Sequence, residues 1–332
     1  MSFLIIGAGS WGSATALHLA RLNHDVTVWG RDAAQMENME KKRENKKYLP
    51  GIILPKNIVF ISGDIEKAMG HAENIILAVP SHVFREMLYK IKPYFSHDKT
   101  LIWITKGLDP ETHELLHQVV QEILGDTVKL AILSGPSFAK EVANDLPTAV
   151  TLASNDKKLA EKLVHLFHSP HFRVYASADI KGVEIGGAVK NVLAIAVGIA
   201  QGLGCGANAQ AALITRGLAE MMRLGRALGG NSETFMGLSG MGDLVLTCTN
   251  DQSRNRRFGI AIGMGISQEK ALENIGQVVE GIQTTNEIYN LAKKYNIDMP
   301  ITEHIYKVLY QHISPAKALD DLLAREPKDE HR

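Results

Sequence analysis

Three glycines near the start of the chain have the spacing of a phosphate-binding loop. Gly7, Gly9 and Gly12 follow the apolar run Phe3–Ile6 and precede a helical pattern that begins near Ala14. In such a strand–turn–helix the first glycine permits a tight turn, the second lets backbone approach a pyrophosphate, and the third lets helix and strand pack closely. The free N–H groups of the helix start favour phosphate. We therefore predict a dinucleotide-binding loop, with a ligand-free tight turn as the alternative.

The end of the second strand indicates which dinucleotide would bind. The apolar run Val26–Trp29 is followed by Gly30, Arg31 and Asp32. An arginine at this place accommodates a ribose 2′-phosphate, whereas a carboxylate binds the ribose 2′-hydroxyl. Arg31 therefore favours NADPH, and Asp32 keeps NADH open. The alternative is that Arg31 is an ordinary solvated residue.

A lysine and an asparagine interrupt a long apolar helical pattern in the second half of the chain. Lys190 and Asn191 follow Gly186 and Gly187 within this pattern. Glycine inside a helix costs about 1 kcal/mol relative to alanine, so the two glycines indicate that something approaches closely. Lysine is rarely buried without a role or a partner, which makes Lys190 a candidate reactive group. A side chain that snorkels at the helix edge is the alternative.

Two further clusters carry groups that suit an anionic ligand. The glycine-rich stretch 237–243 ends in Asp243, whose carboxylate could point into a site or could cap a helix. Ser253 has the position of a helix N-cap, with Arg254 and Asn255 in the first turn. An arginine there opposes the helix dipole unless an anion, such as a substrate phosphate, binds at the helix end. A basic surface patch is the alternative.

Two loops of the first half follow apolar runs at their carboxyl ends. Lys106 follows the run 101–105, whereas Gly135, Ser137 and Ala139 follow the run 130–133. Ligands of open α/β sheets bind at this edge, so these four residues should line a cleft between two domains. An exposed Lys106 without a ligand is the alternative.

The elements that must position these residues fall into two groups. The first half alternates apolar runs with amphipathic stretches, which is typical of a sheet covered by helices on both faces. After about residue 179, apolar residues recur at helical spacing and strand signals nearly vanish. We predict an α/β fold, with a Rossmann-like doubly wound domain over residues 1–180 and a mostly α-helical substrate and catalytic domain over residues 181–332. The expected strands are 3–6, 26–29, 59–61, 75–79, 101–105, 130–133, 149–152 and 172–175, and the expected helices are 14–22, 82–91, 111–124, 157–167, 183–199, 209–228, 284–293 and 301–310.

Composition disfavours several other classes of function. The chain has 36 Lys+Arg and 36 Asp+Glu residues, so no net field attracts nucleic acid or an anionic membrane. Cys205 and Cys248 are the only cysteines, which fits a reduced, cytoplasmic protein without a disulfide framework. We expect no signal peptide and no membrane or nucleic-acid partner.

Two short motifs are discounted on their context. His113 and His117 match a zinc-protease pattern, but they fall in the expected helix 111–124, where no third ligand is evident, so no metal is expected. The basic run Lys41–Lys47 is expected to be a solvated helical segment.

Taken together, the motifs resemble the NAD(P)-dependent glycerol-3-phosphate dehydrogenases of the bacterial type. The resemblance covers nearly the whole chain, and its most specific parts are 212–220, Gly240–Asp243, Ser253–Asn255 and Val278–Gly281. It implies the reversible reduction of dihydroxyacetone phosphate to sn-glycerol 3-phosphate by NAD(P)H, which supplies phospholipid synthesis. It also implies a homodimer.

The resemblance further implies a role for each site residue. Lys190 would donate a proton during reduction and accept one during oxidation; an ammonium group there would also stabilise the negative charge that develops on the substrate oxygen. Substrate contacts are implied for Lys106, Gly135, Ser137, Lys190, Asp243, Ser253, Arg254 and Asn255. Besides Gly7, Gly9 and Gly12 of the loop, cofactor contacts are implied for Ser10, Trp11, Arg31, Lys106, Ala139, Arg254, Val278 and Glu280.

Two other functions stay open on the residues alone. One is a related dehydrogenase of the hydroxyisobutyrate type that acts on another small acid, but Arg254 and Asn255 favour a phosphorylated substrate. The other is a non-catalytic dinucleotide sensor or scaffold, against which the presence of both Lys106 and Lys190 argues.

Overall fold

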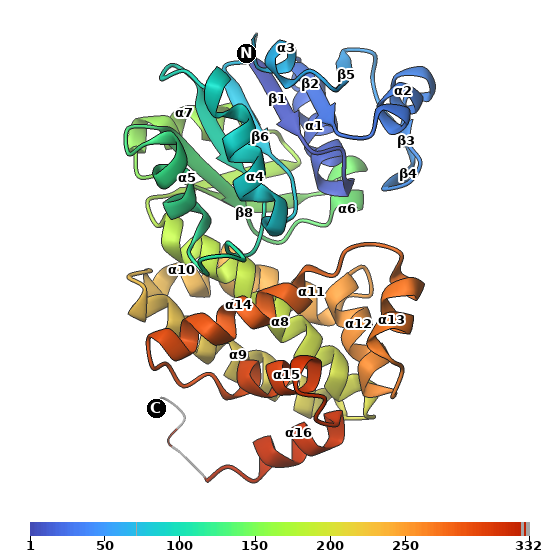
Figure 1. Ribbon diagram of the computed structural model, residues 1–332, viewed down its shortest axis with the longest axis vertical. Coiled ribbons are helices and arrows are strands. Elements are labelled where there is room, and N and C mark those ends of the chain that lie inside the picture. Colours follow the sequence, from blue (N-terminus) through green and yellow to red (C-terminus); the bar gives the residue numbers. More distant parts are fainter. Residues whose placement is uncertain (71, 327–328, 330–332) are drawn as a thin grey trace.

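The computed structural model describes residues 1–70, 72–326 and 329 of the chain. The N-terminal half forms a sheet covered by helices, and the C-terminal half forms a separate helical layer beneath it (Figure 1). The chain passes from one half to the other after β10 (Phe172–Ser177), where Asp179 caps α8 (Ile180–Gly202) by accepting a hydrogen bond from the Gly182 N–H.

An eight-stranded sheet forms the centre of the N-terminal half, in the order β10-β9-β8-β7-β6-β1-β2-β5. All neighbouring strands are parallel except β8 and β9, which are antiparallel. The order reverses between β1 and β6, and the carboxyl ends of the strands beside such a switch point form the crevice where ligands bind. The strands, besides β10, are β1 (Ser2–Ile6), β2 (Asp25–Gly30), β5 (Ile58–Ser62), β6 (Asn74–Leu77), β7 (Thr100–Trp103), β8 (Lys129–Ser134) and β9 (Thr148–Ala153).

Helices cover both faces of this sheet, which explains why its central strands β1, β6, β7 and β8 are apolar at nearly every position. In β1, Phe3 and Ile5 face one core, and Leu4 and Ile6 face the other. Helices α1 (Ser10–Arg21), α2 (Ala33–Lys42), α6 (Ala139–Ala143) and α7 (Lys157–Phe167) contribute to the first core, whereas α3 (Ile65–Gly70), α4 (Ser81–Ile91) and α5 (Leu116–Leu124) contribute to the second. The predicted doubly wound α/β sheet is therefore confirmed.

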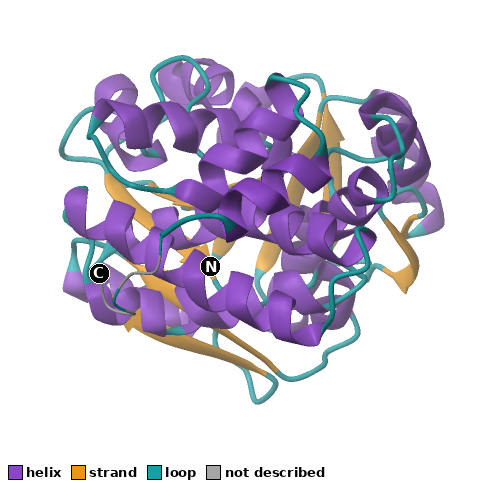
Figure 2. Ribbon diagram, turned by 90° about the horizontal axis from the view of Figure 1, so that it is seen from below, coloured by secondary structure: helices purple, strands orange, loops and turns teal. Residues whose placement is uncertain are grey.

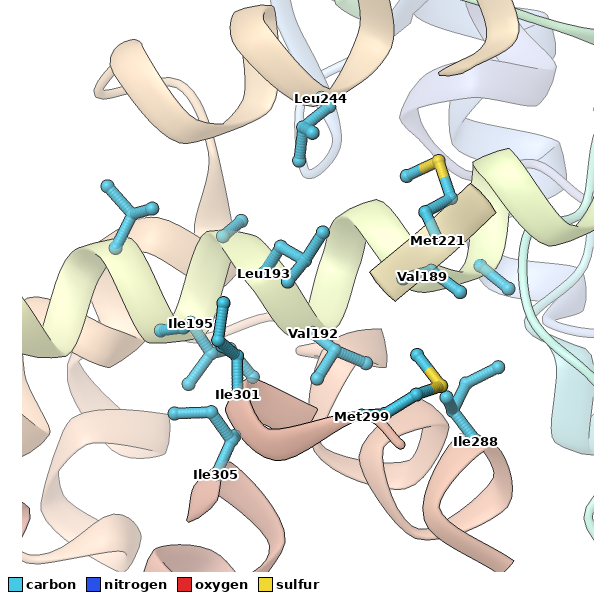
Figure 3. Close-up of a cluster of buried hydrophobic side chains, with 14 of the residues drawn as sticks. Val189, Val192, Leu193, Ile195, Met221, Leu244, Ile288, Met299, Ile301 and Ile305 are labelled. Atoms are coloured by element: carbon cyan, nitrogen blue, oxygen red, sulfur yellow. The ribbon is translucent and has the colours of Figure 1, made fainter. Parts of the chain in front are cut away.

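The C-terminal half is built around α8. Figure 3 shows Val189, Val192, Leu193 and Ile195 of this helix among apolar side chains of the surrounding helices. Seen from the helical end, the helices lie in layers in front of the strands (Figure 2). The surrounding helices are α9 (Ala207–Ala227), α10 (Ser232–Met236), α11 (Asp243–Thr249), α12 (Arg254–Gly263), α13 (Gln268–Ile275), α14 (Glu280–Lys294), α15 (Pro300–Tyr310) and α16 (Pro315–Leu323).

Helix α8 is also the one described helix that is long and apolar enough to cross a membrane. Its most apolar window is entirely buried inside the protein, so it is the core helix of this half rather than a lipid-facing span.

Helices α8 and α12 pack backbone against backbone. A Cβ atom added at Gly198 would lie 2.3 Å from the Arg256 carbonyl oxygen, and one added at Gly259 would lie 2.2 Å from the Ile195 carbonyl oxygen. Gly202 and Gly263, one turn further along each helix, are equally confined. Only glycine permits so close an approach.

The predicted helix 111–124 is wrong in its first part, because α5 begins only at Leu116. The Asp109 carboxylate accepts hydrogen bonds from both the N–H and the hydroxyl of Thr112, which closes a turn. His113 follows with a left-handed φ of 60°. Residues 107–115 therefore form a connection whose polar side chains compete with helix formation.

The basic run Lys41–Lys47 is helical only at its start. Helix α2 ends at Lys42, Arg43 is left-handed, and β3 (Glu44–Asn45) pairs with β4 (Leu49–Ile53). The cause is Asn45, whose buried side-chain amide donates to the Ala8 carbonyl and the Ser13 hydroxyl. These bonds fasten the segment to the glycine loop and its helix.

Candidate active site

The glycine loop lies at the switch point of the sheet, and each of its glycines has a distinct surrounding. Gly7 has φ +121°, and a Cβ atom there would lie 2.4 Å from the Ala78 carbonyl oxygen. A Cβ atom at Gly12 would lie 2.0 Å from the Gly7 carbonyl oxygen, whereas one at Gly9 would meet no described atom within 4 Å. Gly7 and Gly12 thus close the turn, and Gly9 borders open space.

This open space suits a pyrophosphate. Gly9 is the N-cap of α1, and no side chain caps the helix. The first N–H groups of α1 are therefore left for a ligand, and the helix dipole favours an anion there. The residues present thus fit the phosphates of a dinucleotide.

Arg31 and Asp32, the two residues that could select between NADPH and NADH, differ in what they contact. Arg31 is exposed directly after β2 and makes no hydrogen bond to any described residue. The Asp32 carboxylate instead caps α2, accepting from the Gln35 N–H at 3.0 Å. On the other side of the loop, Ser10 donates to the Tyr48 carbonyl, and Trp11 is half-buried. The guanidinium thus stays available, while the carboxylate is engaged in its own helix.

Two lysines and one aspartate from three distant segments meet at the boundary between the two halves. Lys190 Nζ donates to Asp243 Oδ1 at 2.7 Å, and Lys106 Nζ donates to Asp243 Oδ2 at 2.5 Å. Lys190 is 7% exposed and Asp243 is 1% exposed. The alternatives of a snorkelling Lys190 and a helix-capping Asp243 are therefore wrong, because both side chains turn inward to form one buried cluster.

The local backbone explains how these side chains meet. Lys106 follows β7, Lys190 lies in the middle of α8, and Asp243 begins α11 after the π-helical turn η2 (Leu238–Gly242). A Cβ atom at Gly187 would lie 3.2 Å from Ser134 Oγ and 3.5 Å from Lys106 Cγ, so Gly187 lets α8 pack closely on the end of β8, with the Lys106 stem alongside. The two glycines noticed in the sequence thus have a packing reason, since Gly186 likewise approaches the Ser239 carbonyl.

Burial sets the electrostatics of the cluster. It lowers the pKa of Lys190 to about 8; Asp243 opposes this shift and Lys106 adds to it. Burial alone would raise the pKa of Asp243, but the ammonium groups of Lys106 and Lys190 outweigh that effect and hold it below its usual value. The cluster therefore contains a firmly ionised carboxylate beside a lysine that can change its protonation state near neutral pH.

The loop after β8 adjoins the same cluster. Lys106 Nζ donates to the Gly135 carbonyl at 3.3 Å, and the Ser137 hydroxyl donates to the same carbonyl at 2.8 Å. Ala139 begins α6 just beyond. The structure thus brings Gly135 and Ser137 to Lys106, as expected for residues that line one cleft.

Thr247 and Asn191 also belong to the cluster, although the sequence did not mark either as a site residue. Lys190 Nζ also donates to Thr247 Oγ1 at 2.8 Å. Asn191 Nδ2 is buried without a hydrogen-bond partner among the described residues, although Asn191 Oδ1 accepts from Asn255. The spacing of Asp243 and Thr247, one helical turn apart, would have indicated that both lie on the same face of one helix.

The cluster at the start of α12 faces the start of α14. Ser253 caps α12 as predicted, accepting from the Arg256 N–H at 3.2 Å. Arg254 donates to the Val278 carbonyl at 2.8 Å, and Asn255 Oδ1 accepts from the Gly281 N–H at 2.9 Å. Arg254 and Asn255 are thereby brought beside Val278 and Glu280. No hydrogen bond among the described residues joins either this group or the Lys190 cluster to the glycine loop.

The histidine motif has a structural explanation. His113 lies in the left-handed turn before α5, whereas the His117 N–H and ring Nδ1 lie 2.9 and 2.5 Å from the two carboxylate oxygens of the buried Glu184. His117 thus links α5 to α8 rather than facing solvent. The described residues contain no group of three or more His, Cys, Asp or Glu side chains placed to hold a metal ion.

A glycine loop at the switch point of a doubly wound sheet, in one chain with a buried lysine that can exchange a proton, is typical of a nicotinamide-dependent oxidoreductase. The two halves match the two family models of NAD-dependent glycerol-3-phosphate dehydrogenase, the N-terminal one over residues 2–160 and the C-terminal one over residues 179–320. The chain belongs to this family. NADH or NADPH is therefore its cofactor, and its substrate is a small phosphorylated molecule.

Individual relatives agree over the full length. The glycerol-3-phosphate dehydrogenase (NAD(P)+) of Colwellia psychrerythraea is 52% identical over 327 residues, with 98% of each chain covered. That of Serratia proteamaculans is 50% identical over 330 residues, covering 99% of this chain and 97% of the relative. The crystal structure of the Coxiella burnetii enzyme has a TM-score of 0.95 at 44% identity and covers 98% of this chain and 99% of its own. This kinship and the burial of α8 are those of a soluble enzyme.

Proposed function

We propose that this chain reversibly reduces dihydroxyacetone phosphate to sn-glycerol 3-phosphate with NAD(P)H, and so supplies the glycerol backbone of phospholipids. The observation that carries the proposal is the buried cluster in which Lys106 and Lys190 share Asp243 at distances of 2.5 and 2.7 Å. The cluster lies where the loops after β7 and β8 meet the helical half, which is the edge where ligands of such sheets bind.

Bound NAD(P)H supplies the hydride for the substrate carbonyl carbon. Lys190 gives its proton to the carbonyl oxygen as negative charge develops there, and the ammonium groups of Lys190 and Lys106 stabilise that charge. A pKa of about 8 leaves Lys190 mostly protonated at neutral pH but able to release the proton. Asp243 keeps both ammonium groups turned toward the reacting oxygen.

The other end of the substrate carries a phosphate, for which Arg254 and Asn255 at the start of α12 are the proposed ligands. The helix dipole and the guanidinium both favour an anion there. Asn191 links the two ends, because its Oδ1 accepts from Asn255 while its buried Nδ2 stays free for a substrate oxygen. Gly135, Ser137 and Ser253 complete the proposed contacts with substrate.

For the cofactor we propose that Gly7, Gly9 and Gly12 cradle the pyrophosphate together with Ser10 and Trp11. Arg31 binds the 2′-phosphate, so NADPH is preferred over NADH. Its exposed guanidinium and the capping role of Asp32 support this preference. Lys106, Ala139, Arg254, Val278 and Glu280 are the further proposed contacts with the cofactor.

We also propose a cytoplasmic homodimer without membrane or nucleic-acid partners. The balance of 36 basic and 36 acidic residues supports the lack of attraction to polyanions, and the family resemblance supports the dimer.

The decisive experiment is NADPH oxidation, followed by absorbance, with dihydroxyacetone phosphate as substrate and then repeated with NADH. We expect turnover with both cofactors and a higher kcat/KM with NADPH. Unphosphorylated ketones and small keto acids serve as controls, since efficient turnover of these instead would favour a dehydrogenase of the hydroxyisobutyrate type. Cofactor binding without turnover of any phosphorylated ketone would favour a sensor or scaffold.

A further inference from the structure

We infer that Glu287 of α14 is a positioning residue for Lys106, acting through the backbone of the loop that carries this lysine. The inference rests on the proposed function of Lys106 in substrate binding. Glu287 lies outside the proposed contacts with substrate and cofactor, and nothing in its sequence surroundings distinguishes it from other glutamates on helices.

The loop after β7 is held between both halves of the molecule. Gly107 has φ +131°, and a Cβ atom there would lie 2.8 Å from Ser81 Oγ of α4 and 3.5 Å from Thr284 Oγ1 of α14. Thr105 donates to the Val79 carbonyl at 2.7 Å. Lys106 therefore lies between Thr105, which is hydrogen-bonded to the segment after β6, and Gly107, which lies between α4 and α14.

Leu108 joins this loop to the helical half. Its side chain is fully buried and belongs to the core around α8, not to either core of the sheet. Its N–H donates to Glu287 Oε2 at 3.2 Å. Because Glu287 is 0% exposed, no water can replace it as the acceptor without rearrangement.

Lys106 is thus fixed at both ends. Asp243 holds its ammonium group, and Glu287 holds the backbone two residues further on. Without the carboxylate, the buried Leu108 N–H loses its partner, and the loop must shift to satisfy it. A shift of this loop would misplace Lys106 relative to the substrate. It would leave the glycine loop in place, because the glycine loop follows β1 and the Lys106 loop follows β7.

Acceptance of this hydrogen bond does not require a charge. Burial raises the pKa of Glu287 to about 7, whereas the hydrogen bond from the Leu108 N–H lowers it. The carboxyl group offers an acceptor oxygen in either protonation state. Glutamine keeps that oxygen, so Glu287→Gln is the conservative variant.

Glu220 provides a matched control. It is also buried, its pKa is also raised to about 7, and it also accepts from backbone, namely from the Ile301 and Thr302 N–H groups at 2.5 and 3.1 Å. These bonds tie α9 to α15 within the helical half. Glu220→Ala therefore reports the cost of losing a buried carboxylate that has no connection to Lys106.

The test is steady-state NADPH oxidation by Glu287→Ala, Glu287→Gln and Glu220→Ala in the wild-type and Lys106→Ala backgrounds. We expect Glu287→Ala to raise KM for dihydroxyacetone phosphate about tenfold, as for one lost hydrogen bond. KM for NADPH should rise less, because Lys106 is only one of many proposed contacts with the cofactor. Glu287→Gln should stay within about twofold of wild type. In the Lys106→Ala background, Glu287→Ala should add no further loss.

Several outcomes contradict the inference. The positioning role of Glu287 is overturned if the losses of Glu287→Ala and Lys106→Ala add in the double variant. It is also overturned if KM for NADPH rises as much as KM for dihydroxyacetone phosphate, or if Glu287→Gln is as impaired as Glu287→Ala. The same holds if Glu220→Ala shows the same rise in KM. An unchanged KM for dihydroxyacetone phosphate in Lys106→Ala would overturn the proposed role of Lys106 as well. Glu287→Leu, which fills the volume without an acceptor, replaces the alanine variant if that variant does not fold.

Discussion

The glycine loop and the Lys190 cluster are built in opposite ways. The loop is one short stretch of chain, and its shape comes from backbone that only glycine permits, as at Gly7 and Gly12. The cluster joins Lys106, Lys190 and Asp243, which lie far apart in the sequence and meet only because α8 packs under the sheet. A local motif is thus easily recognised but says only that a dinucleotide binds, whereas the reaction depends on tertiary contacts.

The strongest test of this contrast separates chemistry from cofactor binding. We expect Lys190→Ala to lower kcat by about 10²–10⁴-fold, the usual contribution of a general acid. The dissociation constant for NADPH, measured by its fluorescence, should stay unchanged because Lys190 makes no hydrogen bond to the loop. Near-normal turnover by this variant would refute its role as proton donor.

Within the loop, substitution of Gly12 and of Gly9 by alanine should have different effects on stability. Gly12→Ala forces a Cβ atom to within 2.0 Å of the Gly7 carbonyl and should cost about 1–3 kcal/mol of folding free energy, measured by urea unfolding. Gly9→Ala meets no neighbour and should change stability by less than about 0.5 kcal/mol. It should nevertheless weaken NADPH binding, because its Cβ enters the space proposed for the pyrophosphate. Equal effects of the two variants on stability would contradict these separate roles.

A smaller effect is expected at the residue that selects the cofactor. Arg31→Ala should reduce the preference for NADPH over NADH, as a ratio of kcat/KM values, by about tenfold through loss of a charge-assisted hydrogen bond. Asp32→Asn is the matched neighbour; it retains a capping oxygen for α2 and should leave the ratio unchanged. If Arg31→Ala prefers NADPH over NADH as strongly as the wild type does, Arg31 is not the residue that binds the 2′-phosphate.

The finest distinction comes from the pH dependence of reduction. The donor must be the ammonium form of Lys190, so kcat/KM should fall as the pH rises through about 8. Thr247→Val removes an acceptor of this ammonium group and disfavours the charged form, which lowers the pKa. The falling limb should therefore move to lower pH, by less than about one unit. A limb that moves upward, or that is unchanged, would exclude Thr247 as a stabiliser of the protonated lysine.

Much of the N-terminal half could be predicted from sequence because both faces of its sheet are buried. Nearly continuous apolar runs located six strands of the sheet, and two further candidate strands correspond to β9 and β10. Such patterns carry no direction, and the antiparallel pairing of β8 with β9 was not foreseen. The late start of α5 and the early end of α2 were missed for a shared reason. In each case a polar side chain, Asp109 or Asn45, makes hydrogen bonds that override helical propensity.

In the C-terminal half the sequence predicted single residues but not their partners. Lys190 was singled out because lysine is unusual in an apolar helix, and Asp243 because it ends a glycine-rich stretch. That both bind one another, and that Glu184 and Glu287 accept backbone N–H groups from the N-terminal half, depends on packing across the boundary. Helical periodicity shows that a face is buried but not what it is buried against.

The backbone contact between α8 and α12 has a consequence for substrate length. Lys190 lies on one of these helices and Arg254 on the other, and Gly198 and Gly259 bring the two main chains together without intervening side chains. Main-chain contacts do not relax by rotamer changes, so the spacing between the proton donor and the proposed phosphate ligand is nearly fixed. We expect a ketone phosphate longer or shorter by one carbon to reach only one of the two ends. Selection by molecular length would then be a property of the helix pair, and it would persist when side chains of the site other than Lys190 and Arg254 are exchanged.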